Sequence, residues 1–461
     1  MSQTRQTVSV TQGHVQDLNW SQVDLPVQWN SDDDADCCSN ILQGTQYFLD
    51  SSSSRAKSTL GQLFSYAAEQ MSHHRLWVFA VAIYGSYARF FRFDRSSIVI
   101  SAPVKYMENS RIFLEFFWRY ARLDAVTRGY DPTVSPASSP ECALFDAKIK
   151  EYLERAERRR LRKYPGVEDL TNDQYVTSKV RVDDRDGGVS YWIVRKPLAQ
   201  PHLLLPCGKN TRGYIAVEAP DLDASGLPLG DENEAMNKED RCELYWLKDS
   251  WRLEECEAEA DIYHDLKKAK VSHVPVVKCA GDVLQGENED GDVDEDEDGA
   301  EEEEDVVEDE HDECDDGGED EAEDGIDREV QQTTNQKWLS HPGARTIWKG
   351  VTGRIQPCIH HRVVQEVVYP LSCVQSAREL VRATRDVLET VIEAYYNANL
   401  LHLDISKGNV MLTEKFTDGQ DESGVLNDWD ISHFVGLGTR HRSGTWPFMS
   451  IQLLEDPKKT A

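Results

Sequence analysis

The sequence predicts an α+β protein in which a small α/β domain precedes a larger β-rich unit that ends in a helical part. Short runs rich in Val, Ile and aromatic residues, broken by Gly-Ser and Asp-Arg-Ser turns, are typical of strands. Apolar residues at helical spacing indicate amphipathic helices between them. The 461 residues suffice for two or three domains, and 39% hydrophobic residues with 11 Trp predict at least one sizeable core.

Residues 1–58 are polar and rich in Ser and Asp, so we expect them to be mostly irregular. Residues 59–165 form the predicted small α/β domain. Its elements, in order, are a helix at 60–71, strands at 76–85, 87–94 and 96–103, and a helix at 112–123. A basic stretch at 147–164 follows, and we expect it to be a solvated linker helix rather than a nucleic-acid contact.

The larger unit spans residues 190–461. We expect its strands within 190–198, 202–219, 242–251 and 360–371, and a long amphipathic helix at 376–399. An acidic insertion, 285–328, interrupts it and holds about 26 of the 83 acidic residues, with no Lys or Arg between Glu287 and Asp324. One sign of charge and low hydrophobicity predict that the insertion is disordered. The remainder is only mildly acidic, so the formal charge of -33 carries no strong nucleic-acid signal.

The ten cysteines are scattered without C-x-x-C spacing, and the first residues lack the apolar core of a secretory signal. The longest apolar run, 76–84, is about half the length needed to cross a bilayer. These features predict a reduced, intracellular protein that makes no membrane contact.

A polar constellation follows the long helix. The stretch LLHLDISKGNVMLTE places Asp404 and Asn409 five positions apart between two apolar runs, and GVLNDWDIS then places Asp428 after a short strand. Phosphoryl transfer needs a carboxylate that orients the attacking hydroxyl and oxygen ligands that hold Mg²⁺. Each residue alone could be a turn-forming Asx residue. Their order and spacing together indicate phosphotransferase chemistry more specifically.

With these motifs the chain resembles the fungal-type protein kinase family. The resemblance covers LHLDISKGNVML, GVLNDWDIS and RHRSGTWPFMSIQLL, and it extends upstream to YWLKDSWR and to GSYARFFRFDRSSIV. It implies a protein kinase-like bilobal fold, with a β-rich lobe and a helical lobe, behind the small α/β domain. It also implies ATP and Mg²⁺ as cofactors.

The resemblance assigns a role to each matching residue. Lys248 would contact the α- and β-phosphates, and its partner would be Glu259, although Glu255 and Glu257 lie nearby. Asp404 would be the catalytic carboxylate. Asn409 and Asp428 would hold Mg²⁺.

The resemblance also implies the nucleotide-binding segments. Val364–Val368, including Glu366, would be the hinge at which adenine docks. PCGKNTRGY would be the phosphate loop, with Gly208 and Gly213, although Asn210 stands where a second glycine is usual. An ordinary glycine-containing hairpin is the alternative for this loop.

Three departures from the family pattern stand out. Leu403 replaces the arginine that usually precedes the catalytic Asp, which argues against switching by loop phosphorylation. Asp430 replaces the glycine of Asp-Phe-Gly. The sequence ends soon after the activation segment, so we expect an incomplete helical lobe with exposed apolar surface. In the N-terminal part, Gln28 and Asn30 occupy the places of a nuclease's metal-binding residues, so we expect a structural or partner-binding module there.

The favoured hypothesis is an ATP-dependent kinase acting on protein serine or threonine hydroxyls. A nucleotide-binding scaffold without catalysis is the first alternative, and a small-molecule kinase of the aminoglycoside or choline type is the second. The protein substrate is unknown. The acidic insertion could bind a basic protein, or it could only keep the chain soluble.

Overall fold

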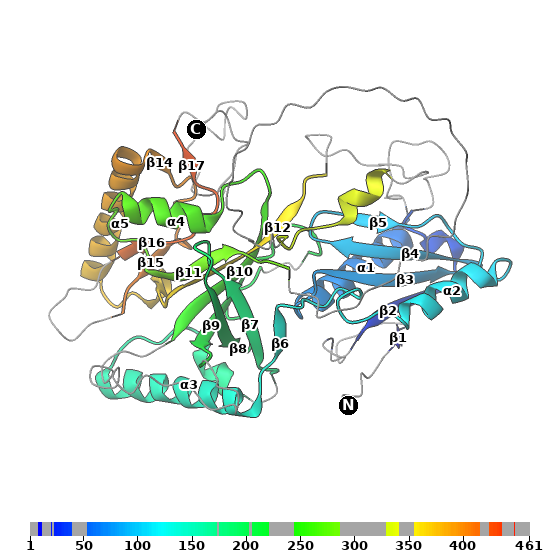
Figure 1. Ribbon diagram of the computed structural model, residues 1–461, viewed down its shortest axis with the longest axis horizontal. Coiled ribbons are helices and arrows are strands. Elements are labelled where there is room, and N and C mark those ends of the chain that lie inside the picture. Colours follow the sequence, from blue (N-terminus) through cyan, green and yellow to red (C-terminus); the bar gives the residue numbers. More distant parts are fainter. Residues whose placement is uncertain are drawn as a thin grey trace, which may run out of the picture.

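The structure is a computed structural model that describes residues 8–11, 20, 23–38, 53–172, 175–201, 205–220, 244–285, 329–340, 355–414, 424–435 and 447. It shows an α+β chain with two main sheets (Figure 1). The N-terminal unit lies at one side of the molecule, the second sheet lies in the middle, and α4 and α5 lie at the other side (Figure 1).

The N-terminal unit is a sheet covered by one helix on each face. Its strands, in sheet order, are β1 (Val8–Thr11), β2 (Leu25–Asn30), β3 (Trp77–Tyr84), β4 (Tyr87–Asp94) and β5 (Ile98–Ile100). Side chains alternate along a strand, so both faces of β3 can be apolar and covered. α1 (Ser54–Met71) packs on the face of Val78 and Ala80, and α2 (Ser110–Tyr120) packs on the face of Phe79 and Val81.

These elements confirm the predicted order helix, three strands, helix. β1 and β2 were not predicted, and β2 lies inside the polar stretch expected to be mostly irregular. β2 pairs in parallel with β3, and its residues Leu25 and Val27 are buried in the apolar cluster that α2 covers.

The second sheet has seven strands in the order β11-β12-β10-β9-β8-β7-β6, and all neighbours are antiparallel. The strands are β6 (Val134–Pro136), β7 (Ser178–Asp183), β8 (Val189–Val194), β9 (Arg212–Glu218), β10 (Tyr245–Leu253), β11 (Val277–Asp282) and β12 (Cys358–Glu366). The expected strands at 190–198, 202–219, 242–251 and 360–371 correspond to β8, β9, β10 and β12.

The two faces of this sheet pack against different parts of the molecule. One face carries Leu247, Tyr214 and Val364 in an apolar core, followed along the strands by buried charges that meet the N-terminal unit. There Arg362 lies 2.8 Å from Asp131, and Arg212 donates to the carbonyl of Ser72. The other face carries Lys248 and Val363, and α4 (Glu259–Lys268) covers it at the β12 end.

The basic helix α3 (Ser139–Arg159) packs on the face that carries Lys248, at the β8–β9 end, where Figure 1 shows it running below these strands. Ser138 and Glu141 form a capping box at its start. The prediction of a solvated linker helix is therefore wrong. Apolar side chains recur at helical spacing among the arginines, and Phe145, Ile149 and Tyr152 are buried against the sheet.

The helical part contains α5 (Ala377–Ala398) and short strands. β13 (Tyr369–Pro370), β15 (Val410–Leu412) and β16 (Gly424–Leu426) form a three-stranded sheet, and β14 (Leu400–Leu401) pairs with β17 (His433–Phe434). Short 3-10 helices lie at Asp33–Ala35 (η2), Val167–Thr171 (η4), Asn335–Ser340 (η6) and Leu371–Cys373 (η7). Among the described residues, α5 exposes six large apolar side chains: Leu380, Val381, Leu388, Ile392, Tyr395 and Tyr396.

None of the described helices is both long and apolar enough to span a bilayer. The expected disorder of the acidic insertion falls on residues 286–328, which lie outside the described residues, and so does nearly all of the activation-segment motif GTWPFMS.

Candidate active site

The centre of the site is the side chain of Lys248 on β10. Its Nζ lies 2.7 Å from Glu259 Oε2, at the start of α4, and 2.5 Å from Asp428 Oδ1, just after β16. Asp430 Oδ2 lies 3.5 Å from the same nitrogen. The structure thus brings three predicted site residues into contact, with Asp430 as a fourth member that the sequence did not assign.

The contact with Lys248 identifies Glu259, among the three candidate glutamates, as the partner of the lysine. Glu259 is 2% exposed and begins α4 on the face that packs against β10, whereas Glu255 and Glu257 are exposed in the turn before the helix. Glu259 Oε1 also accepts a hydrogen bond from the backbone N–H of Trp429, at 3.2 Å. One carboxylate therefore connects β10, α4 and the segment that carries Asp428.

Burial and charge together set the protonation of this cluster. Burial alone would lower the pKa of Lys248, but the carboxylates of Asp428, Asp430 and Glu259 raise it well above its usual value. Burial raises the pKa of Glu259 despite the nearby ammonium group of Lys248. Burial opposes ionisation of Asp430 too, yet Lys248 and Lys209 lower its pKa to about 2.

The predicted catalytic carboxylate and one predicted metal ligand contact each other in the loop between β14 and β15. Asn409 donates through Nδ2 to the backbone oxygen of Asp404, at 2.8 Å, and to Asp404 Oδ2, at 3.2 Å. Because the amide nitrogen is used in this way, the ligand atom that Asn409 can offer a cation is its Oδ1.

His402 joins this loop to the segment that carries Asp428. Its Nδ1 accepts from the N–H of Asp404, at 3.2 Å, so the ring proton is on Nε2, which donates to the backbone oxygen of Asn427, at 3.0 Å. Burial lowers the pKa of His402, which keeps the ring neutral for this double role. A backbone bond from Asn427 N to Asn409 O, 2.9 Å, adds a second link.

Two backbone conformations at the site are unusual. Leu403 has φ +63° and Asp428 has φ +65°, the left-handed region that residues with a side chain rarely adopt. Such strain persists only where surrounding contacts impose it, and it is often found at functional positions. Here the bonds of Asp404, Asn427 and Trp429 impose it on both residues.

The aromatic residue between the two aspartates anchors them. Trp429 is fully buried, its Nε1 donates to the carbonyl of Leu426 at 2.9 Å, and its ring meets His402 edge-on with centroids 4.6 Å apart. With Trp429 fixed in the core, Asp428 and Asp430 on either side of it both reach Lys248.

The predicted phosphate loop lies between β8 and β9, at the start of β9 beside Lys248. Gly213 is the direct partner of Lys248 in the sheet. Gly208, at φ +103°, donates its N–H to the carbonyl of Arg95, and Asn210 donates to the carbonyl of Leu205 at 2.7 Å. The loop is therefore held against the N-terminal unit by its own backbone and by Arg95.

Sequence reasoning missed Lys209, which extends from this loop to place its Nζ 3.1 Å from Asp430 Oδ2. Its signal was present in PCGKNTRGY, where a lysine follows the first glycine of a loop assigned to phosphates. The site thus carries two ammonium groups, Lys209 and Lys248, at neighbouring positions.

Two predicted residues lie away from Lys248. The side chain of Val364 points to the opposite face of the sheet, into the core with Leu247 and Tyr214. Glu366 pairs with the edge of β11, because its N–H donates to the carbonyl of Val276 and its carboxylate accepts the Val276 N–H, both at 2.9 Å. Burial raises the pKa of Glu366. Neither side chain is brought to the Lys248 cluster.

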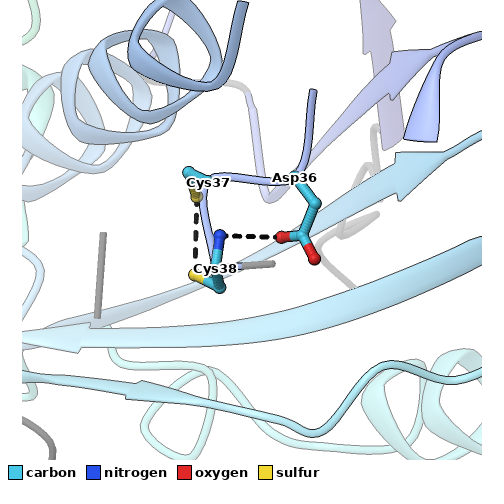
Figure 2. A group of neighbouring side chains, drawn as sticks. All are labelled: Asp36, Cys37 and Cys38. Atoms are coloured by element: carbon cyan, nitrogen blue, oxygen red, sulfur yellow. Dashed lines mark hydrogen bonds between the residues drawn. The ribbon is translucent and has the colours of Figure 1, made fainter. Parts of the chain in front are cut away.

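Two clusters elsewhere have the residue types of a metal site. Asp36, Cys37 and Cys38 lie together in the N-terminal unit (Figure 2). However, Arg89 lies 2.8 Å from Asp36 in a buried ion pair, and Asp36 also accepts the N–H of Cys38, so this carboxylate is already neutralised. In the other cluster, of His273, Asp386 and Glu389, Asp386 accepts hydrogen bonds from Arg385 and from the N–H of Gly424. Neither cluster fits a cation well.

Comparisons with known proteins identify the family of the chain. The model of a family described as fungal protein kinase matches residues 22–190 and 233–460. No curated protein matches the sequence significantly. Among solved structures, the chain is similar to the ROP18 kinase domain in complex with AMP-PNP and sucrose, with 12% identity over 68% of this chain and 70% of that chain. The TM-score of 0.25 is too low for that overlap to support an argument.

Proposed function

Because this chain belongs to the fungal protein kinase family, we propose that it transfers the γ-phosphate of ATP to serine or threonine hydroxyls of a protein. The observation that carries the proposal is the contact of Lys248 with both Glu259 and Asp428. A lysine held by a helix glutamate and an aspartate that can bind a metal is the arrangement by which protein kinases position nucleotide phosphates.

The donor set suits Mg²⁺. Asp428 supplies a carboxylate with a side chain 36% exposed, and Asn409 supplies an amide oxygen, the hard oxygen ligands that this ion prefers. The carboxylates of Asp404, Glu259, Asp428 and Asp430 outnumber the ammonium groups of Lys248 and Lys209, so a cation would relieve the excess negative charge. Mg²⁺, when bound, supplies charge neutralisation for the phosphates.

The remaining work falls to the side chains. Lys248 would bind the α- and β-phosphates in place of part of its contact with Asp428. Asp404 would accept a hydrogen bond from the substrate hydroxyl, orient it toward the γ-phosphate and take up its proton. Asn409 fixes Asp404 by its own hydrogen bonds, so that the carboxylate is pre-oriented.

Transfer of labelled phosphate from ATP to a general protein substrate tests this function. We expect Asp404→Asn and Asp428→Asn each to lower the transfer rate by about 100-fold or more, as does the loss of one group that stabilises charge in a transition state. Asp261→Asn is the matched control, because Asp261 lies on α4 in an exposed pair with Arg185. Transfer that is absent from the native chain, or equal in all variants, would contradict the proposal.

A second candidate function, a nucleotide-binding scaffold without catalysis, is favoured by one observation. Asn210 stands where the phosphate loop of the family usually has a second glycine, and its side chain is engaged within the loop by donating to the carbonyl of Leu205 at 2.7 Å. Binding of Mg-ATP without any transfer would support the scaffold. The predicted intracellular location and basic protein partner remain proposals that accompany either function.

A further inference from the structure

We propose that residues 139–171, which comprise α3, η4 and the segment between them, occupy the nucleotide-base position of this site, so that a nucleotide base binds only when they withdraw. The inference concerns the regulation of the active site and rests on the proposed function. It is carried by contacts that the catalytic proposal does not use.

The register of the second sheet locates the base position. Lys248, which would hold the phosphates, is flanked by Gly213 and Val363, and the hinge expected to hold the base, Val364–Val368, begins within the last residues of β12. Two residues before Lys248 on the same face is Trp246, flanked by Ile215 and Gln365. The side chains of Trp246 and Ile215 therefore form the sheet surface between Lys248 and the end of β12.

Side chains of residues 139–171 cover this stretch. Ile193, Ile215 and Val217, which form the sheet surface there, are 0–2% exposed. They are buried by a cluster that includes six side chains of the segment: Phe145, Ile149, Tyr152, Tyr164, Val167 and Leu170. The ring of Tyr164 lies against Trp246, with centroids 4.8 Å apart and planes tilted by 33°. An aromatic ring thus lies where a base ring would lie.

The segment also contacts the helical part, so it fills the space between the two lobes. Tyr369 on β13 and Leu412 on β15 belong to the same apolar cluster. The hydroxyl of Tyr152 accepts the N–H of Tyr164 at 2.9 Å and lies 3.3 Å from the hydroxyl of Tyr369. Tyr152 therefore joins the helix, the inserted ring and the helical part at one point.

Two ion pairs tie the segment to the helical part. Arg155 lies 2.5 Å from Glu414, just after β15, and their side chains are 11% and 17% exposed. Arg162 pairs with Glu379 on α5, and both side chains are nearly buried. The basic stretch was expected to be exposed to solvent. Instead, its residues Arg155 and Arg162 form ion pairs that hold the segment against the helical part.

Because residues 139–171 belong to the same chain, they compete with a nucleotide for the base position whatever the concentration of the protein. If only a fraction of molecules has the segment withdrawn, the apparent Kd for the nucleotide is the intrinsic Kd divided by that fraction. Weakening one tie increases the fraction and tightens apparent binding, without any change in the residues that touch phosphate.

The test measures binding of a fluorescent ATP analogue with Mg²⁺ to the full chain. Arg155→Gln removes a tie outside the base position, and we expect its apparent Kd to be about three- to tenfold lower than that of the native chain. The matched control is Lys150→Gln on the same helix, whose pair with Glu154 is exposed, and we expect it to bind like the native chain. Equal or weaker binding by Arg155→Gln would overturn the proposal.

Tyr164→Ala removes the inserted ring and should lower the apparent Kd by about tenfold. A second readout needs no variant: hydrogen exchange of the native chain with and without saturating Mg-ATP. Displacement predicts that amides of 160–171 exchange faster with the nucleotide, whereas protection or no change there would overturn the proposal. Tighter binding without phosphate transfer would keep the proposal and refute catalysis, and transfer with unchanged exchange would do the reverse.

Discussion

At one end of the candidate site, Lys248 contacts Glu259, Asp428 and Asp430, while at the other end, two residues earlier on the same strand, Trp246 packs against Tyr164. The first end is charged and partly open, since the side chain of Asp428 is 36% exposed. The second is apolar and closed. The charged end and the apolar end are set independently, because ion pairs need a few atoms at fixed distances whereas the apolar contact depends on how side chains fill volume.

The charged end should be the more sensitive to substitution. Lys248→Met leaves three carboxylates around an apolar side chain, so we expect a loss of about 3–5 kcal/mol of unfolding free energy, as when one partner of a buried pair is removed. Denaturant unfolding of the full chain measures it. Lys196→Met, which removes a more exposed pair with Asp169, should cost less than about 1 kcal/mol. Equal costs for both lysines would show that the cluster is not held by its buried charge.

The apolar end predicts coupling between a glycine and a tryptophan. A Cβ at Gly213 would lie 2.0 Å from Cζ2 of Trp246, so Gly213→Ala should cost about 1–3 kcal/mol by overpacking. In a Trp246→Ala background the same change should be nearly neutral, and a double-mutant cycle on unfolding free energies measures the difference.

Gly61→Ala is the control for this cycle. It lies on α1 with no heavy atom within 4 Å of the added Cβ, and it should stabilise the chain slightly in either background. The absence of coupling between Gly213 and Trp246 would place the indole elsewhere than against the strand.

Acid should weaken the charged end in a defined pH range. The pKa of Asp430 is lowered to about 2 by Lys248 and Lys209 against the effect of burial, so its folded-state pKa lies below its unfolded value. Its stabilisation is present above about pH 4 and is lost as the pH falls toward 2, a change on the order of 2 kcal/mol. Unfolding of the native chain and of Asp430→Asn between pH 2 and 5 checks this. Identical slopes would exclude the contribution.

The smallest expected effect is that of Lys209. Its side chain is 47% exposed, so the pair with Asp430 is screened by solvent. We expect Lys209→Gln to change the unfolding free energy by less than about 1 kcal/mol and to weaken Mg-ATP binding in low salt by a few fold, an effect that fades in high salt. If the substitution does not affect Mg-ATP binding at low salt, Lys209 does not contribute to that binding.

The charged end of the candidate site could be predicted from the sequence better than the apolar end. Asp404, Asn409 and Asp428 could be recognised because their spacing along the chain reflects one loop and one short strand. Glu259 could be only one of three candidates, and its contact with Lys248 distinguishes it. Asp430 was not assigned a role, since its contacts with Lys248 and Lys209 join segments more than 180 positions apart, whereas Lys209 could have been noticed as a lysine in the predicted phosphate loop.

The placement of α3 shows the limit most clearly. Its arginines led to the prediction that the helix is exposed to solvent. However, Phe145, Ile149 and Tyr152 on its other face are buried against the second sheet and fix its position. The amphipathic pattern is visible in the sequence, but it does not state which surface the apolar face meets.

From the sequence come most of the longer strands and helices, because periodicity is a local property, and the short motifs that carry carboxylates and amides suited to phosphate chemistry. The contacts of Tyr164 with Trp246 and of Arg155 with Glu414 could not be read from the sequence, because they depend on how whole elements pack. Burial and charge pairing select one packing among many that the same local pattern permits.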